Sequence, residues 1–188
     1  MPIQTRAIDI DEERARLYDQ MDEVAEEQAA YENPEATRYQ QLLARGHQLQ
    51  RYREILAWVA DEWDVDSIEL AGLSPGEINR VNKLVSETNA TERDVYVTIG
   101  TVDDDVPYLQ HAPEEVGEDT IAATQSIKQT LGKVVGETPL PYVRWAEERI
   151  NDLTHPGVDE GNGYLSLLSE KQRAQMSNAE SGSDTSAP

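Results

Sequence analysis

Residues 39–63, YQQLLARGHQLQRYREILAWVADEW, decide the fold because they predict one long helix with a single partner-facing side. The apolar positions recur at alternating steps of three and four residues, which aligns them along one face of an α-helix. Sustained over the whole stretch, this spacing is typical of a seam that packs against another helix. Gly46 and Arg53 interrupt it. The seam positions are Tyr39, Leu42, Gly46, Leu49, Arg53, Leu56, Ala60 and Trp63.

The nearest partner for this seam is a second predicted helix, at residues 11–31. Asp9 and Asp11 are suitable N-caps for it, since a carboxylate can accept hydrogen bonds from the free backbone N–H groups of the first turn. Asn33 and Pro34 are predicted as the cap and the first position of the long helix, where proline's missing N–H costs nothing. A short turn between two helices predicts a helical hairpin. Because the first helix is shorter, part of the seam needs a further partner, either the next domain or another copy of the chain.

A helix start signal follows the hairpin. Ser74 is predicted as the N-cap, Pro75 as the first helical residue and Glu77 as the second half of a capping box. Ahead of this signal, residues 67–70 predict either a short strand or an extended linker. The apolar side of the capped helix consists of Ile78, Val81, Val85 and Thr88.

Residues 95–102, VYVTIGTV, form the most β-prone segment of the chain, because β-branched residues dominate it. A strand here would find a partner only in residues 68–70, so its sheet would be small or completed by another molecule. Tertiary contacts can override β propensity, and the segment is open to either strand or helix. Residues 103–117 predict a surface loop, since they combine acids with two prolines.

Two further helices are predicted near the end of the folded region. One runs through residues 119–135 with Gly136 as its stop, and the other follows residues 138–141, with Pro141 as its first-turn proline. The composition after residue 176 predicts disorder, and a short helix at 165–176 is a further possibility. The inward positions are Ile121, Ile127, Leu131 and Val135 in the first helix and Val143, Ala146, Ile150 and Leu153 in the second.

Together these elements predict a mainly α fold. An N-terminal helical hairpin is followed by a small helical domain with at most one or two short strands. The predicted parts are an N-terminal arm at 1–10, the hairpin at 11–63, the helical domain with its short β segment at 64–154, and a flexible tail at 155–188.

The charge of the chain indicates its environment. Asp and Glu number 37 against 16 Lys and Arg, giving a net charge of −21 on 188 residues. The acids are interleaved with apolar residues, so they predict the solvated faces of folded helices. Such a surface repels itself until salt screens it, and at 1 M salt the screening length is only about 3 Å. We therefore expect a protein of a salt-loving host; an acidic protein from an ordinary cytoplasm is the alternative.

Composition also narrows the function classes. There is no cysteine, so disulfides and thiolate metal sites are excluded. No apolar run approaches the length of about 20 residues that spans a bilayer, and the first residues lack the pattern of a signal peptide, so we expect a cytoplasmic protein that binds no membrane. The negative charge argues against nucleic-acid binding, because that affinity depends on Lys and Arg neutralising phosphates. The densest basic stretch, Arg45, Arg51 and Arg53, lies among acids of neighbouring turns.

Candidate catalytic and metal-binding residues do not form a known motif. His47, His111 and His155 are far apart in sequence and none has a partner at ligand spacing. Asp103, Asp104 and Asp105 could attract a hard cation, but Tyr108 occupies the sixth position, where a calcium loop requires glycine. We therefore expect no catalytic residues, no metal and no cofactor, and a non-enzymatic protein whose exposed apolar stripes bind other proteins.

The order of four segments along the chain resembles that of a known protein family. They are the long helix at 39–63, IELAGLSPGEINRVNKLV at 68–85, VTIGTVDDDVPYL at 97–109 and LPYVRWAEERINDLT at 140–154. This order resembles the tail assembly chaperones of siphovirus-like tailed phages and haloarchaeal tailed viruses. The resemblance covers residues 39–154 and implies a small, helical, non-enzymatic protein of the host cytoplasm that binds the tape measure protein during tail assembly.

On this hypothesis the partner-binding residues are the two apolar stripes. The alternative is a virion component, such as a head–tail connector or tail protein, that forms a homo-oligomeric ring through the β-prone segment. The predicted partner-binding residues are Tyr39, Leu42, Leu49, Leu56, Trp63, Ile78, Val81 and Val85.

Overall fold

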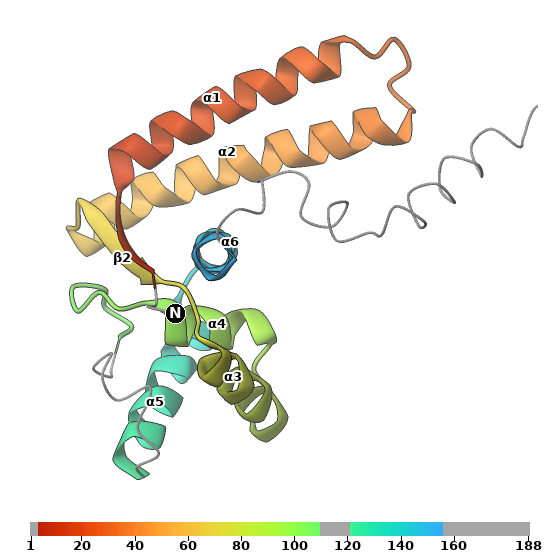
Figure 1. The fold of residues 1–188 in the computed structure, drawn as a ribbon. Coiled ribbons are helices and arrows are strands. Elements are labelled where there is room, and N and C mark those ends of the chain that lie inside the picture. The colour runs from red at the N-terminus through yellow and green to blue at the C-terminus, as the bar shows by residue number, and fades with distance from the viewer. Residues whose placement is uncertain (1–3, 110–120, 156–188) are drawn as a thin grey trace, which may run out of the picture. The chain divides into compact units, whose positions relative to one another are not determined.

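Helices make up most of the structure, a computed structural model that describes residues 4–109 and 121–155. Within those ranges a two-stranded antiparallel sheet accompanies the helices (Figure 1). The predicted mainly α fold with one or two short strands is thereby confirmed. In chain order the elements are β1 (Thr5–Asp9), α1 (Ile10–Ala29), α2 (Thr37–Trp63), β2 (Ser67–Ala71), α3 (Pro75–Glu87), α4 (Glu92–Gly100), α5 (Ile121–Glu137) and α6 (Leu140–Thr154).

The first two helices form the predicted hairpin and lie side by side (Figure 1). Asp9 caps α1, its Oδ1 accepting a hydrogen bond from the Glu12 N–H at 2.9 Å. At the middle of the hairpin, a Cβ built on Gly46 would lie 3.8 Å from Cγ1 of Val24. The seam side of α2 therefore faces α1 there, and the interruption at Gly46 admits a side chain of the neighbouring helix.

The predicted start of the long helix is wrong. Ala36, not Asn33, holds the cap position of α2, and it makes no side-chain hydrogen bond. Asn33 Oδ1 instead accepts a hydrogen bond from the Glu35 N–H at 2.9 Å, so the side chain closes a local turn that competes with capping. The predicted end at Trp63 is confirmed, and Asp64 follows it in the left-handed region with φ of 55°.

Residues 67–70 belong to a strand, which decides the choice between strand and linker. The partner is β1, from the segment predicted only as an N-terminal arm, and Ile8 pairs with Ile68 in the antiparallel register. Ile8 is the only buried residue among the five of β1, so the sequence of this strand shows no clear apolar alternation. Thr101 adds an isolated bridge to Leu70 on the other side.

The capping box predicted for α3 is confirmed. Ser74 Oγ accepts a hydrogen bond from the Glu77 N–H at 3.3 Å, and Glu77 Oε2 accepts one from the Ser74 N–H at 2.6 Å. Pro75 occupies the first turn, where it removes no helical hydrogen bond. The start of this helix is therefore fixed by local chemistry.

Replacing Ser74 with alanine is expected to lower the free energy of unfolding by about 1 kcal/mol, because the first turn of α3 loses its cap. Urea denaturation at constant salt measures the change. Ser86→Ala is the matched control on the same helix, since its exposed hydroxyl donates only to the Lys83 carbonyl oxygen, and a change within about 0.5 kcal/mol is expected for it. Equal losses for the two variants would contradict the capping assignment.

The β-prone segment is helical, not extended. Residues 95–100 lie in α4, which begins with a second capping box: Thr91 Oγ1 accepts from the Asp94 N–H at 3.3 Å, and Asp94 Oδ2 accepts from the Thr91 N–H at 2.9 Å. Every residue from 95 to 100 is buried. A helix surrounded by the core has no polar face, so its sequence lacks the periodicity that would identify it.

The two last helices are present, with two corrections. In α5, Ile127 and Leu131 are buried as predicted, but Val135 is 56% exposed and Val134 points inward instead. Gly136 does not stop the helix, which continues through Glu137. At the end of α5 the predicted inward residue is therefore one position too late in the sequence.

In α6, the buried residues Val143, Ala146 and Ile150 confirm the predicted inward face. This helix contacts α2, β2 and α4 and so joins the hairpin to the helices that follow (Figure 1). Trp145 and Tyr142 are fully buried on it. The described residues up to Thr154 accordingly form one compact unit. The predicted tail beyond residue 155, with its possible helix at 165–176, lies outside the described residues.

Candidate functional site

Half of the predicted partner-binding residues lie in the interior. Leu42, Leu49, Leu56 and Val81 are between 0% and 4% exposed. In this conformation they contact other residues of the chain, and another molecule cannot reach them. Their role in binding stays a prediction that would require the hairpin or α3 to open.

The other four, Tyr39, Trp63, Ile78 and Val85, are half-buried. Trp63 packs edge-on against Tyr142, with ring centroids 4.9 Å apart, and against Tyr108 at 5.7 Å. The hydroxyls of both tyrosines are buried and hydrogen-bonded. The Tyr108 hydroxyl lies 2.9 Å from Thr101 Oγ1 and 2.9 Å from the Tyr142 hydroxyl. Most residues of the apolar stripes therefore pack in the core or against it.

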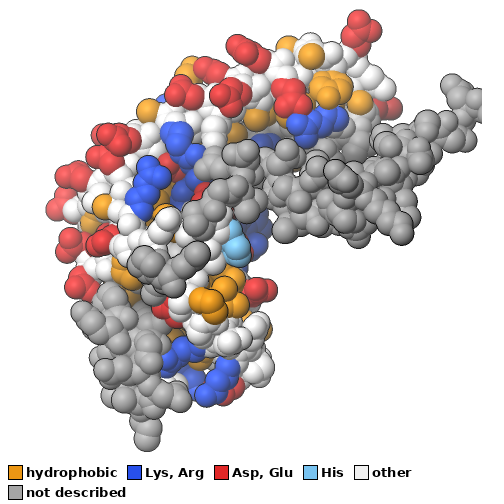
Figure 2. Space-filling model, in the orientation of Figure 1, with side chains coloured by type: hydrophobic (Ala, Val, Ile, Leu, Met, Phe, Trp, Pro, Cys, Tyr) orange, Lys and Arg blue, Asp and Glu red, His pale blue; other side chains and the backbone are white. Residues whose placement is uncertain are grey.

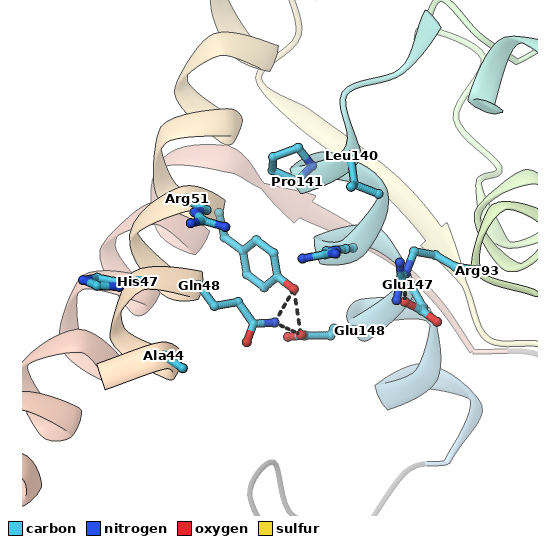
Figure 3. Close-up of a pocket in the computed structure, with 11 residues that line it drawn as sticks. Ala44, His47, Gln48, Arg51, Arg93, Leu140, Pro141, Glu147 and Glu148 are labelled. Carbon is cyan, nitrogen blue, oxygen red and sulfur yellow. Dashed lines mark hydrogen bonds and ion pairs between the residues drawn. The ribbon is translucent and has the colours of Figure 1, made fainter. Parts of the chain in front are cut away.

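A groove of about 490 Å³ lies between α2, the start of α4 and α6 (Figure 3). This volume is within the range of about 300–1,000 Å³ that is usual for ligand sites. On α2 and α6 alike, the lining residues follow one another at helical steps of three and four, so each helix presents one continuous stripe to the groove. The lining residues are Ala44, His47, Gln48, Arg51, Tyr52, Arg93, Leu140, Pro141, Arg144, Glu147 and Glu148.

The wall between α2 and α6 is held by a hydrogen-bond network. The Tyr52 hydroxyl donates to Glu148 Oε1 at 2.7 Å, and the Gln48 amide donates to both of these oxygens at 2.6 Å. Figure 3 shows Gln48 and Glu148 pointing toward one another across the groove. Burial raises the pKa of the Tyr52 phenol, and the nearby Glu148 carboxylate adds to the rise. Tyr52 therefore stays a neutral donor, and the network fixes the separation of the two helices.

Both glutamates of the groove have arginine partners. Arg93 Nε donates to Glu147 Oε2, and this carboxylate raises the pKa of the Arg93 guanidinium. Arg45 lies 3.4 Å from Glu148 Oε2. The negative charges inside the groove are therefore already compensated by residues of the chain itself.

Arg51 and Arg144 are different. Both side chains are exposed and line the groove from opposite helices, and neither forms an ion pair with another described residue. Beside them lie Pro141 and the 53% exposed side chain of Leu140. The groove thus combines two uncompensated guanidinium groups with an apolar rim.

The two guanidinium groups of this cationic groove belong to a strongly acidic chain. The net charge of the chain is −21, and acidic side chains are spread over the face drawn in Figure 2. Arg45 and Arg51 belong to the densest basic stretch of the sequence, but the acids of the neighbouring turns hide the site. The groove could not be seen in the sequence because Arg144, which α6 places beside Arg51, is far from it along the chain. The stripe of polar residues at helical spacing on α2 was the one local signal available.

Among the other candidates for chemistry, Asp103 has a structural role, and His111 lies outside the described residues. Asp103 Oδ2 accepts a hydrogen bond from the Glu69 N–H at 3.0 Å, and its Oδ1 accepts one from the Asp105 N–H at 2.9 Å, so Asp103 ties its loop to β2. In residues 4–109 and 121–155, no three His, Asp or Glu side chains gather as metal ligands would. His47 lies on the rim of the groove. No helix in the described ranges combines the length and apolar character that spanning a membrane requires.

Comparison with known proteins identifies no matching family model, no matching curated protein and no matching solved structure. The chemistry of the groove is therefore the main guide to function.

Proposed function

We propose that this protein is a non-enzymatic protein-binding protein, and specifically a tail assembly chaperone that binds the tape measure protein of a tailed virus in a salt-loving host. The observation that carries the proposal is the groove between α2 and α6, where Arg51 and Arg144 have no carboxylate partner among the described residues. A groove that combines free guanidinium groups with exposed apolar side chains is suited to polypeptide side chains of both kinds.

The charge of the chain explains why such a groove is needed. In a salt-loving cytoplasm a partner protein would also be acidic, and two acidic surfaces repel each other at close range. A cationic groove removes that repulsion at one place and so selects where a partner docks. Arginine forms bidentate hydrogen bonds with carboxylates. Salt weakens this direct contact less than it weakens the attraction between charges that are farther apart.

The order of the elements is a second support. The long helix, the capped helix and the closing helix on which the resemblance to tail assembly chaperones rests all lie in one compact unit. The first residues of the third segment are the end of α4, which is one of the two states that the sequence left open. A chaperone of this kind would act in the host cytoplasm and leave before the tail is complete.

The ring-forming alternative loses the element on which it relied. The ring was expected to form through helix and strand contacts and to use residues 95–102 between neighbouring subunits, and residues 95–100 are a buried helix of the single chain. A ring built in that way would have to unfold α4. Light scattering in molar salt is expected to give a monomer or dimer, and a stable ring of many copies would contradict the chaperone.

Affinity capture from producing cells in molar salt, followed by mass spectrometry, tests the proposed function. The expected result is one dominant partner that is very long, helix-rich and alanine-rich. A capture dominated by capsid and portal proteins would instead indicate a connector, and capture of no viral protein would contradict both assignments.

A further inference from the structure

We infer that the groove between α2 and α6 binds an acidic polypeptide segment of a partner, with Arg51 and Arg144 each holding a carboxylate and Leu140 and Pro141 contacting an adjacent apolar side chain. This inference rests on the proposed protein-binding function and adds the chemistry of the bound segment.

The lining contains three arginines and two glutamates. Arg93 is occupied by Glu147, while Glu148 is occupied by Arg45, Gln48 and Tyr52. Because both glutamates have partners already, they do not neutralise Arg51 and Arg144 within the groove. What the groove offers a ligand is therefore two guanidinium groups, one from each helix.

The residue type indicates the ligand chemistry. A guanidinium presents a planar fork of N–H donors that matches a carboxylate with two parallel hydrogen bonds. All three Lys or Arg residues that line the groove are arginine. Two guanidinium groups therefore favour a planar oxyanion such as a carboxylate over an anion that is recognised by its charge alone.

A polypeptide fits better than a nucleic acid. Double-stranded DNA carries a negative charge about every 1.7 Å along its axis, so phosphates beyond the groove would meet the acidic surface of this chain. A peptide needs only two carboxylates at the groove and can be apolar between and around them. The exposed Leu140 and the adjoining Pro141 supply the matching apolar contact.

The test uses a fluorescent synthetic peptide of Glu, Ala and Leu and a twin in which every Glu is Gln, titrated with the full chain at several salt concentrations. The acidic peptide is expected to bind at least ten-fold more tightly than its twin. Arg51→Gln and Arg144→Gln are each expected to weaken binding by about ten-fold, the range of a charge-assisted hydrogen bond. Arg6→Gln is the matched control, since Arg6 is exposed on β1 outside the groove, and it is expected to change nothing.

Several results would overturn the inference. Equal binding of the two peptides, or equal weakening by Arg6→Gln, would show general charge attraction without a site. Tight binding of succinate or of a DNA duplex, lost in the groove variants while the acidic peptide fails to bind, would assign the groove to another ligand. Self-association of the chain that the groove variants abolish, again without peptide binding, would make the occupant a second copy.

The outcomes separate this inference from the proposed function. If the expected long partner is captured equally by the wild-type chain and by the Arg51→Gln/Arg144→Gln chain, the chaperone stands and the groove is not its binding site. If the acidic peptide binds as expected but no tail protein is captured, the groove chemistry stands and the chaperone does not. Circular dichroism of the variants confirms that folding is unchanged.

Discussion

Gly72→Ala is expected to lower the free energy of unfolding by about 3 kcal/mol or more, because backbone atoms fill the space that a side chain would need. A Cβ at this position would lie 2.5 Å from the carbonyl carbon and oxygen of Leu153 and 2.8 Å from the Thr154 nitrogen. The end of β2 and the end of α6 meet here, and Leu73 N–H donates to Thr154 Oγ1 at 2.9 Å. Relief of the clash would have to separate the two elements.

Gly132→Ala is the matched control for this substitution. Gly132 lies in α5, and a Cβ there would meet no atom within 4 Å. Alanine in a helix interior is favoured over glycine, so a gain of about 0.5–1 kcal/mol is expected. Urea denaturation of both variants at the same salt measures the contrast. A Gly72→Ala chain as stable as wild type would mean that β2 and α6 do not approach as described.

Glu13→Gln is the second substitution with a large expected effect, since Glu13 is a buried carboxylate between two helices. Its side chain is 6% exposed on α1. Glu13 Oε1 accepts a hydrogen bond from Trp145 Nε1 at 2.9 Å and lies 3.3 Å from Nε of Arg149, both on α6. Arg16 completes the cluster at 2.8 Å. Glu13→Gln removes the carboxylate charge that this buried cluster shares, although Arg149 keeps a second carboxylate partner in Asp152 at 2.7 Å. A loss of about 3 kcal/mol is expected.

The same carboxylate gives a pH dependence with a definite sign. Burial alone would raise the pKa of Glu13, but the two arginines and the indole outweigh it and lower that pKa below the ordinary value of 4.5. A group whose pKa is lowered by folding stabilises the fold above its unfolded pKa, and this contribution is lost as pH falls through the folded-state pKa. The difference between wild type and Glu13→Gln is therefore expected to be largest near neutral pH and to shrink below pH 4.5.

Denaturation of wild type, Glu13→Gln and Glu23→Gln across this pH range measures the effect. Glu23 is exposed on the same helix, so its substitution is expected to change stability by less than about 0.5 kcal/mol. A difference between wild type and Glu13→Gln that does not depend on pH would contradict the charged cluster.

Local chemistry explains which elements could be predicted. The capping box at Ser74 and Glu77 and the cap at Asp9 are complete within a few residues, and both helix starts were found. The long seam was found because its period extends over many turns. One signal gave a wrong prediction, because Asn33 closes a turn instead of capping a helix. The β-branched residues of α4 left strand and helix open, and core packing around them decides for the helix.

The groove could not be predicted because it depends on contacts between distant segments. Arg51 and Arg144 are ordinary exposed arginines in the sequence, and only the packing of α6 against α2 places them together. Which arginines are free is also a tertiary property, since Arg45 and Arg93 are paired by glutamates of α6. The sequence showed correctly that the chain is acidic, but it could not show which arginines lie together without a carboxylate partner among the described residues.

Quantitative affinity capture with the wild-type chain and the Arg51→Gln/Arg144→Gln chain, side by side in molar salt, tests the binding groove most directly. The expected result is that the wild-type chain retains a long, helix-rich tail protein and the double variant, equally folded, loses most of it. Recovery of the same partner in the same amount by both chains would contradict the assignment of the groove as the binding site.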